Sequence, residues 1–263
     1  MGACLRLVHN VTYSCNYKCW HCYNNSRPKS LDNTRNLQDV AKQLCDFEFE
    51  SVSLSGGEPL LVPEIFEIAG IYRAAGMPIA LISNGSLITQ NNIGKIEKAF
   101  DHIQISIDNW IDPEYGRIEK GNPSFGKYLR RCVSLLSKSS IPATYTFVPN
   151  RLNISITEYF EELYFDGLKG LVVQEAVSAG RATQRQDMFL SEEDRTMLAD
   201  SLRKIARDYS LPVQYIRRKR PSNSTITVDP AGTLWLDSFA PVRICDSVEC
   251  GLVEDKILRR RLK

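Results

Sequence analysis

Short apolar runs alternate with amphipathic stretches along the first two thirds of the chain. Runs of strand length occupy residues 4–14, 51–54, 78–82, 102–107, 142–148 and 168–174. Between them, apolar residues recur at helical spacing over residues 37–49, 63–75, 89–100, 125–137 and 156–165. This alternation predicts an α/β fold with a parallel sheet and right-handed crossovers. Six such units do not close an eight-stranded barrel, so we expect an open sheet.

The remaining third has a different pattern. Residues 190–209 predict an amphipathic helix. Because ligands bind at the carboxyl ends of parallel strands, we expect a site where the first six strands end.

Composition narrows the class of protein. The chain has 263 residues and is 43% hydrophobic, enough for one large folded domain. A formal net charge of +2 gives no field that favours nucleic acid. We find no apolar run long enough to span a membrane and no secretion signal. Disulfide scaffolds are short and secreted, so the eight cysteines favour a reduced, cytoplasmic protein.

Three of these cysteines, Cys15, Cys19 and Cys22, lie within eight residues. Thiolates are soft ligands that suit zinc or iron–sulfur iron. His21 is the nearest fourth ligand for zinc, but it adjoins Cys22, and adjacent side chains rarely close on one ion. Three cysteines on one loop fit a cubane cluster with one open iron. A zinc knuckle or three unrelated cysteines stay as alternatives.

A second motif, Ser55-Gly56-Gly57-Glu58-Pro59, follows the strand expected at 51–54. Two glycines at a strand end let the backbone approach a ligand closely, and a carboxylate beside them can hold an amino group. With CxxxCxxC ahead of it at this spacing, the chain resembles the radical SAM superfamily. The resemblance covers roughly residues 5–182. It implies a partial (β/α)6 barrel of the radical SAM type.

The resemblance also implies cofactors and a role for each matching residue. Cys15, Cys19 and Cys22 would hold one [4Fe-4S] cluster, and S-adenosylmethionine (SAM) would bind its open iron. The residues that would contact SAM are Gly56, Gly57 and Glu58 at its amino group, His21 at adenine, Asn84 in a Thr-Asn-Gly-like motif, Ser106 and Asp108 in a Ser-Leu-Asp-like motif, and Arg181 at the carboxylate.

Several of these residues have ordinary alternatives. His21 can be a solvated loop histidine, and Ser106 and Asp108 can be turn residues. Arg181, within Gly180-Arg181-Ala182, can form a surface salt bridge.

The same Gly-Arg-Ala resembles a motif of enzymes with a SPASM or twitch extension, and residues 225–235, with Asp229-Pro-Ala-Gly232, look like the hairpin that begins such an extension. We therefore expect a radical SAM barrel over residues 1–182 and a shortened SPASM/twitch-like cap over 183–263. Leu236, Asp237 and Ser238 stand where that extension places a cysteine, and only Cys245 and Cys250 follow. Two thiolates are too few for a second cluster, so we expect one. Cys45 and Cys132 occupy apolar helix positions and are expected to behave as small hydrophobes.

The function implied is reductive cleavage of SAM to a 5′-deoxyadenosyl radical that abstracts hydrogen from a substrate. Relatives with such extensions most often crosslink, epimerise or excise parts of ribosomally made peptides, so a peptide substrate is the leading hypothesis. A sugar- or cyclitol-type dehydrogenase or epimerase, a protein-activating radical enzyme and a non-catalytic scaffold are the alternatives. No catalytic side chain is identified, since nothing ranks Tyr145, Tyr215, Asp237 and Cys245.

Two protein partners are expected besides the peptide. One is an external reductant of the flavodoxin or ferredoxin type. The other is a discrete leader-peptide recognition protein, because the sequence leaves no room for a leader-binding domain ahead of Cys15. The basic run Arg217–Arg220 is a candidate docking surface for it.

Overall fold

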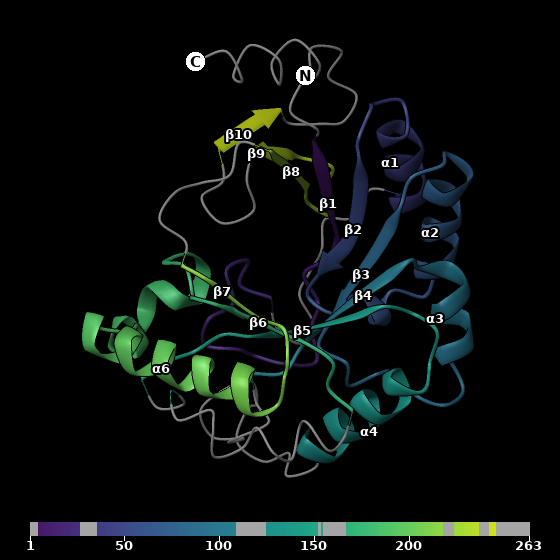
Figure 1. The fold of residues 1–263 in the computed structure, drawn as a ribbon. Helices are drawn as coiled ribbons and strands as arrows, with labels where there is room; N and C mark the ends of the chain where they lie inside the picture. The colour runs from purple at the N-terminus through teal and green to yellow at the C-terminus, as the bar shows by residue number, and fades with distance from the viewer. Residues whose placement is uncertain are drawn as a thin grey trace.

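The computed structural model describes residues 5–26, 36–108, 125–151, 154, 167–217, 224–236 and 242–245. Its strands form one ten-stranded sheet in the order β10-β9-β8-β1-β2-β3-β4-β5-β6-β7. Neighbouring strands from β8 to β7 are parallel, whereas β9 and β10 are antiparallel. The expected α/β fold with a mostly parallel sheet is therefore confirmed. Figure 1 shows the sheet curving round, with β7 and β10 at its two ends.

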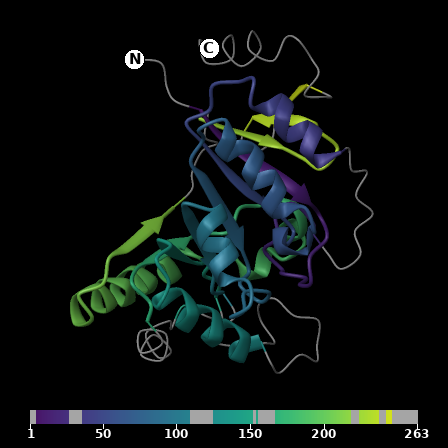
Figure 2. The same ribbon diagram turned by 90° about the vertical axis from the view of Figure 1, so that its right-hand side faces the viewer.

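The first six strands lie where the apolar runs predicted them. They are β1 (Arg6–Thr12), β2 (Ser51–Gly56), β3 (Ile79–Ser83), β4 (His102–Ser106), β5 (Ala143–Phe147) and β6 (Leu171–Gln174). Between them come α1 (Leu37–Leu44), α2 (Ile65–Ala74), α3 (Ile93–Ala99) and α4 (Phe125–Ser137). The helix expected over residues 156–165 lies outside the described residues. Figure 2 shows α1, α2 and α3 side by side over the outer face of the sheet.

The third helix begins later than expected. The sequence predicts a helix from residue 89, but α3 begins at Ile93. The Asn92 side chain instead accepts a hydrogen bond from Thr89 N at 2.8 Å and donates one to Leu87 O at 2.8 Å. The asparagine side chain thus closes a turn over residues 87–92, immediately before the helix.

Side chains alternate between the two faces of the strands, as the pleat requires. Along β4, Ile103 and Ile105 are fully buried, while Gln104 and Ser106, which alternate with them, are only partly buried. The buried set packs against helix residues such as Val40. The apolar positions therefore hold the helices on the convex face, and the polar positions line the concave face.

Residues beyond 182 extend both ends of this sheet. After α6 (Glu192–Asp208), β7 (Val213–Ile216) pairs with β6. The expected hairpin is present as β8 (Thr225–Val228) and β9 (Leu234–Leu236), and β8 pairs with β1. The strands β7 and β10 (Val242–Cys245) were not predicted. The boundary at residue 182 stays a proposal.

Two local contacts explain where these late elements begin and turn. Ser191 and Asp194 form a reciprocal capping box at the start of α6. Asp229 accepts hydrogen bonds from Ala231 N and Thr233 N in the hairpin turn, and from Trp235 Nε1 at 3.2 Å. Within the described residues, no helix has the length and apolar character needed to cross a membrane.

Candidate cofactor and substrate site

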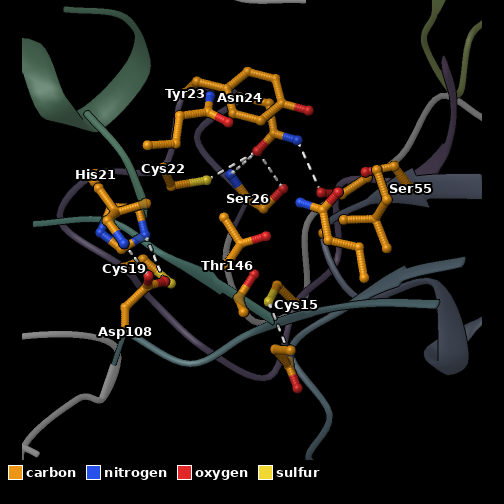
Figure 3. A pocket seen from close by; sticks show the side chains of 18 of the residues that line it. Cys15, Cys19, His21, Cys22, Tyr23, Asn24, Ser26, Ser55, Asp108 and Thr146 are labelled. Atoms are coloured by element: carbon orange, nitrogen blue, oxygen red, sulfur yellow. Dashed lines mark hydrogen bonds and ion pairs between the residues drawn. The ribbon is translucent and has the colours of Figure 1, made fainter. Parts of the chain in front are cut away.

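A cavity of about 400 Å³ opens on the concave face of the sheet. Its upper wall is the loop that follows β1 and carries Cys15, Cys19 and Cys22, all three of which line the cavity. The ends of β2 to β6 supply the other walls. Figure 3 shows side chains from these separate segments pointing toward one another across the cavity. A volume of this size suits a small-molecule ligand.

Two of the three cysteine sulfurs have different contacts. Cys15 Sγ lies 3.9 Å from Asn84 Nδ2, and Tyr17 N donates to it at 3.4 Å. Cys22 Sγ donates to Asn24 Oδ1 at 2.9 Å (Figure 3), and Asn24 Nδ2 donates to Gly56 O at 3.0 Å. Asn24, which sequence reasoning missed, therefore ties the third cysteine to the end of β2.

The paired glycines have a structural reason of their own. Gly56 has φ +131°, and a Cβ there would lie 2.2 Å from Thr12 O. A Cβ on Gly57 would lie 2.1 Å from Ser14 O. Gly57 N donates to Thr12 O at 2.6 Å. Glycine is thus required for the end of β2 to pack against the chain that enters the cysteine loop. Both glycines also line the cavity.

Glu58 lies beneath the cavity wall and is not among the residues that line it. Its side chain is fully buried. One carboxylate oxygen accepts from Leu60 N at 3.1 Å and Ser83 Oγ at 2.9 Å, and the other accepts from Asn84 N at 2.9 Å. The contact of Glu58 with the SAM amino group stays a prediction. In this structure the carboxylate joins the ends of β2 and β3.

Asn84 extends this network to the cysteine loop. Its side chain donates to Asn16 Oδ1 at 2.9 Å and accepts from Ser86 Oγ at 2.6 Å. Asn16 in turn donates to Ser86 Oγ at 2.8 Å. Asn84 lines the cavity, so the end of β3 both faces the cavity and orients Cys15.

His21 and Asp108, which are 87 positions apart, meet at the next strand end. His21 Nε2 lies 3.3 Å from Asp108 Oδ2, with side-chain exposures of 11% and 2%. Asp108 Oδ1 also accepts from Val148 N at 2.6 Å. Figure 3 shows the imidazole and the carboxylate facing each other below the cysteine loop. His21 is therefore not a solvated loop residue, and Asp108 orients it. Ser106 lines the cavity beside them.

Arg181 holds the cysteine loop through hydrogen bonds from a turn that follows β6. It belongs to a 3₁₀ turn, η2 (Gly180–Gln184). Its Nε donates to Cys19 O at 2.8 Å and its backbone N donates to Cys22 O at 2.9 Å. Gly180, with φ +55°, passes so close that a Cβ would lie 2.4 Å from Cys22 O. Among the described residues Arg181 forms no ion pair, and its contact with the cysteine loop was not predicted.

Trp20 reinforces the same junction. It is 8% exposed and packs with Ala182 and Met188, which lies in a second short turn, η3 (Gln186–Met188). Its ring also makes an edge contact with Phe189, with centroids 6.1 Å apart. An aromatic residue between two cysteines was the signal that could have identified this anchor.

Three cavity-lining side chains hold buried polar atoms that lack hydrogen-bond partners in the described structure. They are His21 Nδ1, Thr146 Oγ1 and Arg181 Nη2. An unpaired buried polar atom is costly, so such atoms normally await a ligand or water. Figure 3 places Thr146 in the middle of the cavity. These atoms leave unused donors and an acceptor near the cysteine loop for a polar cofactor.

The donor set fits an iron–sulfur cluster bound by three thiolates. Among the described residues, no group of three or more His, Cys, Asp or Glu side chains is placed to bind a single metal ion. A cubane cluster makes a different demand, because each thiolate binds a different iron. Three cysteines along one wall of a cavity, with unused polar atoms around it, suit a cluster and a polar ligand together.

Comparison with known proteins agrees with this geometry. The family described as the Radical SAM superfamily matches residues 9–164. An S-adenosylmethionine-dependent nucleotide dehydratase from Thermoplasmatales archaeon (strain ISO4-H5) is 31% identical over 107 residues, covering 41% of this chain and 39% of the relative. The PqqA peptide cyclase of Gluconobacter oxydans is 28% identical over 164 residues, covering 59% and 45%. The matched part of the chain spans less than half the length of each of these two relatives.

Solved structures agree on the fold. The structure of anSMEcpe with bound AdoMet and the Cp18Cys peptide superposes with a TM-score of 0.75 at 16% identity, covering 97% of this chain and 80% of that one. At this identity the likeness supports the fold and nothing finer.

Proposed function

The chain belongs to the radical SAM superfamily, and from that membership we propose that it modifies a ribosomally synthesised peptide by hydrogen abstraction. When bound, the cluster and SAM would supply a 5′-deoxyadenosyl radical, with the electron coming from a flavodoxin- or ferredoxin-type reductant. One observation carries the assignment to SAM chemistry: Cys15, Cys19 and Cys22 share one cavity with the strand-end residues that match the family motifs.

The chain's own residues divide the work of binding. Cys15, Cys19 and Cys22 would hold the cluster, and the backbone of Gly56 and Gly57 would approach the SAM amino group. Asn84, Ser106, His21 and Arg181 line the same cavity and would orient SAM. Arg181 Nη2 has no partner in the described structure, so it can meet a carboxylate while Nε holds the loop. Because these groups surround the ligand, they also exclude water from the reaction.

Iron analysis and SAM cleavage test this proposal. After anaerobic reconstitution we expect about four irons per chain, which agrees with one [4Fe-4S] cluster. Addition of dithionite and SAM should release 5′-deoxyadenosine, with or without substrate. About eight irons would defeat the single-cluster proposal. A reconstituted cluster that yields no 5′-deoxyadenosine, even with substrate, would oppose the catalytic one.

The peptide substrate is supported by relatives that act on peptides, such as the PqqA peptide cyclase. Because a flexible peptide loses conformational entropy on binding, we further propose a small recognition protein that presents it. Of the basic run expected to dock that protein, only Arg217 lies within the described residues, where it pairs with Glu192. Turnover of a peptide at a rate unaffected by any companion protein would rule the partner out.

A small-molecule substrate is the second candidate. It is favoured by the nucleotide dehydratase, the relative with the higher identity of the two compared. Mass spectrometry of reactions with a precursor peptide encoded by a neighbouring gene decides between the two candidates. A mass change on the peptide supports the first, and an unchanged peptide with SAM consumed on a nucleotide or sugar supports the second.

A further inference from the structure

The cavity does not end beneath the cysteine loop. Its lining also includes Arg6 and Val8 on β1, Ser53 on β2 and Thr225 at the start of β8. Arg6 is the first residue of β1, a strand of seven residues. At the rise of an extended strand, β1 spans roughly 20 Å. One cavity therefore runs from the cysteines at the carboxyl end of the strands to Arg6 at their amino end.

The half of the cavity toward Arg6, here called the lower half, has polar side chains along its wall. Ser53 and Gln104 line it from β2 and β4, each flanked along its strand by fully buried residues that pack on the opposite face. In the part of the chain that the structure describes, no hydrogen bond engages the side chains of these two residues. The inside of a small barrel is normally filled with branched apolar side chains. A polar, unfilled wall is instead suited to a polar ligand.

The charges on the wall are distributed unevenly. Asp108 faces His21 at 3.3 Å. Glu175 accepts hydrogen bonds from Arg195, Nε at 3.0 Å and Nη2 at 3.1 Å, and from the Tyr215 hydroxyl. Both lining carboxylates are thus already engaged.

Arg6 differs from these. Its side chain is exposed at the amino end of the cavity, and within the described ranges no carboxylate pairs with it. Alternation along β1 directs it to the concave side, since Val8 also lines the cavity while Leu7 is fully buried on the other face. A guanidinium at the end of a polar cavity offers two parallel donors to a carboxylate or phosphate.

We propose that the lower half of the cavity, formed by Arg6, Ser53, Gln104 and Thr225, binds an anionic oxygen group of the substrate. Arg6 donates to the anion, and Gln104 and the hydroxyls of Ser53 and Thr225 hydrogen-bond to the polar groups between it and the reacting carbon. The anion is held at the far end, so the opposite end of the substrate faces the cysteine loop. The inference rests on the proposed function, because it describes the substrate of that reaction. The anion is a carboxylate in a peptide and a phosphate in a nucleotide.

Calorimetry on the reconstituted protein with SAM tests this subsite. Glutarate serves as the carboxylate probe and pyrophosphate as the phosphate probe, both at low ionic strength because salt screens an exposed charge. We expect one of the two to bind. Arg6→Gln should weaken that binding at least about tenfold, the effect of losing a charge-assisted hydrogen bond. Arg6→Lys should restore part of the affinity, and Gln104→Leu should weaken binding while leaving Arg6 in place.

Arg203→Gln is the matched control, since Arg203 is exposed on α6 and is not among the residues that line the cavity. It should bind the probe as the wild type does. The inference is overturned if neither anion binds, or if Arg6→Gln binds as tightly as the wild type. Measurement of 5′-deoxyadenosine on the same samples separates the two proposals. Release of 5′-deoxyadenosine without anion binding defeats only the subsite, and anion binding without SAM cleavage, even with substrate, defeats only the radical reaction.

Discussion

At the scale of single residues, the motif positions have two distinct roles. The three cysteines, His21 and Asn84 line the cavity, where a ligand can reach them. Glu58 lies behind that wall and uses its charge on three donors of the protein itself. A motif residue can therefore serve a ligand by positioning its neighbours, and substitutions should separate the two roles.

Replacing Cys15, Cys19 or Cys22 by alanine should abolish the brown colour of the reconstituted protein and lower 5′-deoxyadenosine release at least about a thousandfold, because a thiolate ligand to iron is lost. Far-ultraviolet circular dichroism should stay that of a folded protein. Cys45→Ala is the matched control: Cys45 is a partly buried thiol at the C-cap of α1, and it should keep its iron. Wild-type SAM cleavage by any one of the three variants would remove that cysteine from the ligand set.

Glu58→Gln should lower both stability and SAM affinity. The amide offers one acceptor oxygen where the carboxylate offers two, so Leu60 N, Ser83 Oγ and Asn84 N cannot all stay satisfied. We expect the free energy of unfolding to fall by about 1–3 kcal/mol and SAM to bind about tenfold more weakly, through displacement of Asn84. Urea unfolding and calorimetry measure the two. Weaker SAM binding at unchanged stability would indicate a direct contact instead.

At the scale of elements, the cysteine loop is held by the ends of other elements. The end of β2 holds it through two glycines that allow backbone contact with Thr12 and Ser14. The residue after β3 holds it through Asn84, and η2 holds it through Arg181. The loop therefore depends on chain segments up to 162 positions away for its shape.

Gly180→Ala tests the hold by η2. The new Cβ would meet Cys22 O and Tyr23 O, each at 2.4 Å, in a backbone conformation with φ +55°. The turn should separate from the loop, so amide hydrogen exchange over residues 15–24 should rise about tenfold or more in the cluster-free protein, and iron content after reconstitution should fall.

Gly70→Ala is the control for that experiment. Gly70 lies within α2 with no atom within 4 Å of its added Cβ. Alanine is the better helix former, so this variant should be as stable as the wild type or more stable by about 0.5–1 kcal/mol. Unchanged exchange of the loop in Gly180→Ala would show that η2 does not hold it.

At the scale of the whole molecule, a buried histidine makes stability depend on pH. His9 lies on the helix-facing side of β1, fully buried, with Nδ1 2.9 Å from the Tyr72 hydroxyl. Burial lowers the pKa of His9 from 6.5 to about 4. Between these values the unfolded chain binds a proton that the folded chain does not. Stability contributed by neutral His9 is complete above pH 6.5 and is lost as pH falls toward 4.

The loss attributable to His9 should amount to about 3 kcal/mol across that window. Urea unfolding of the cluster-free protein at several pH values measures it. His9→Gln cannot titrate, so its stability should change less than that of the wild type over the same range. Equal slopes for the two proteins would contradict the assignment to His9.

The sequence by itself determined the class of fold and the ligand-bearing loop. Strand and helix periods are local, so the six parallel strands were predictable from spacing alone. The hairpin was predicted from the resemblance to a SPASM or twitch extension. The cysteine motif is also local, since its three residues lie within eight positions. The strands β7 and β10 were missed because short strands at sheet ends depend on a partner to pair with.

Only the tertiary structure decided which residues face the ligand. The strand ends are adjacent because the sheet is parallel, and this brings His21 to Asp108 and Arg181 to Cys19 from distant positions. It also turned Glu58 inward, where a buried carboxylate needs several donors to offset its desolvation. The polar wall below the cysteines was visible in the sequence as alternation in strands such as β4. Its meaning depended on curvature, because only a curved sheet brings Gln104, Gln174 and Arg6 around one cavity.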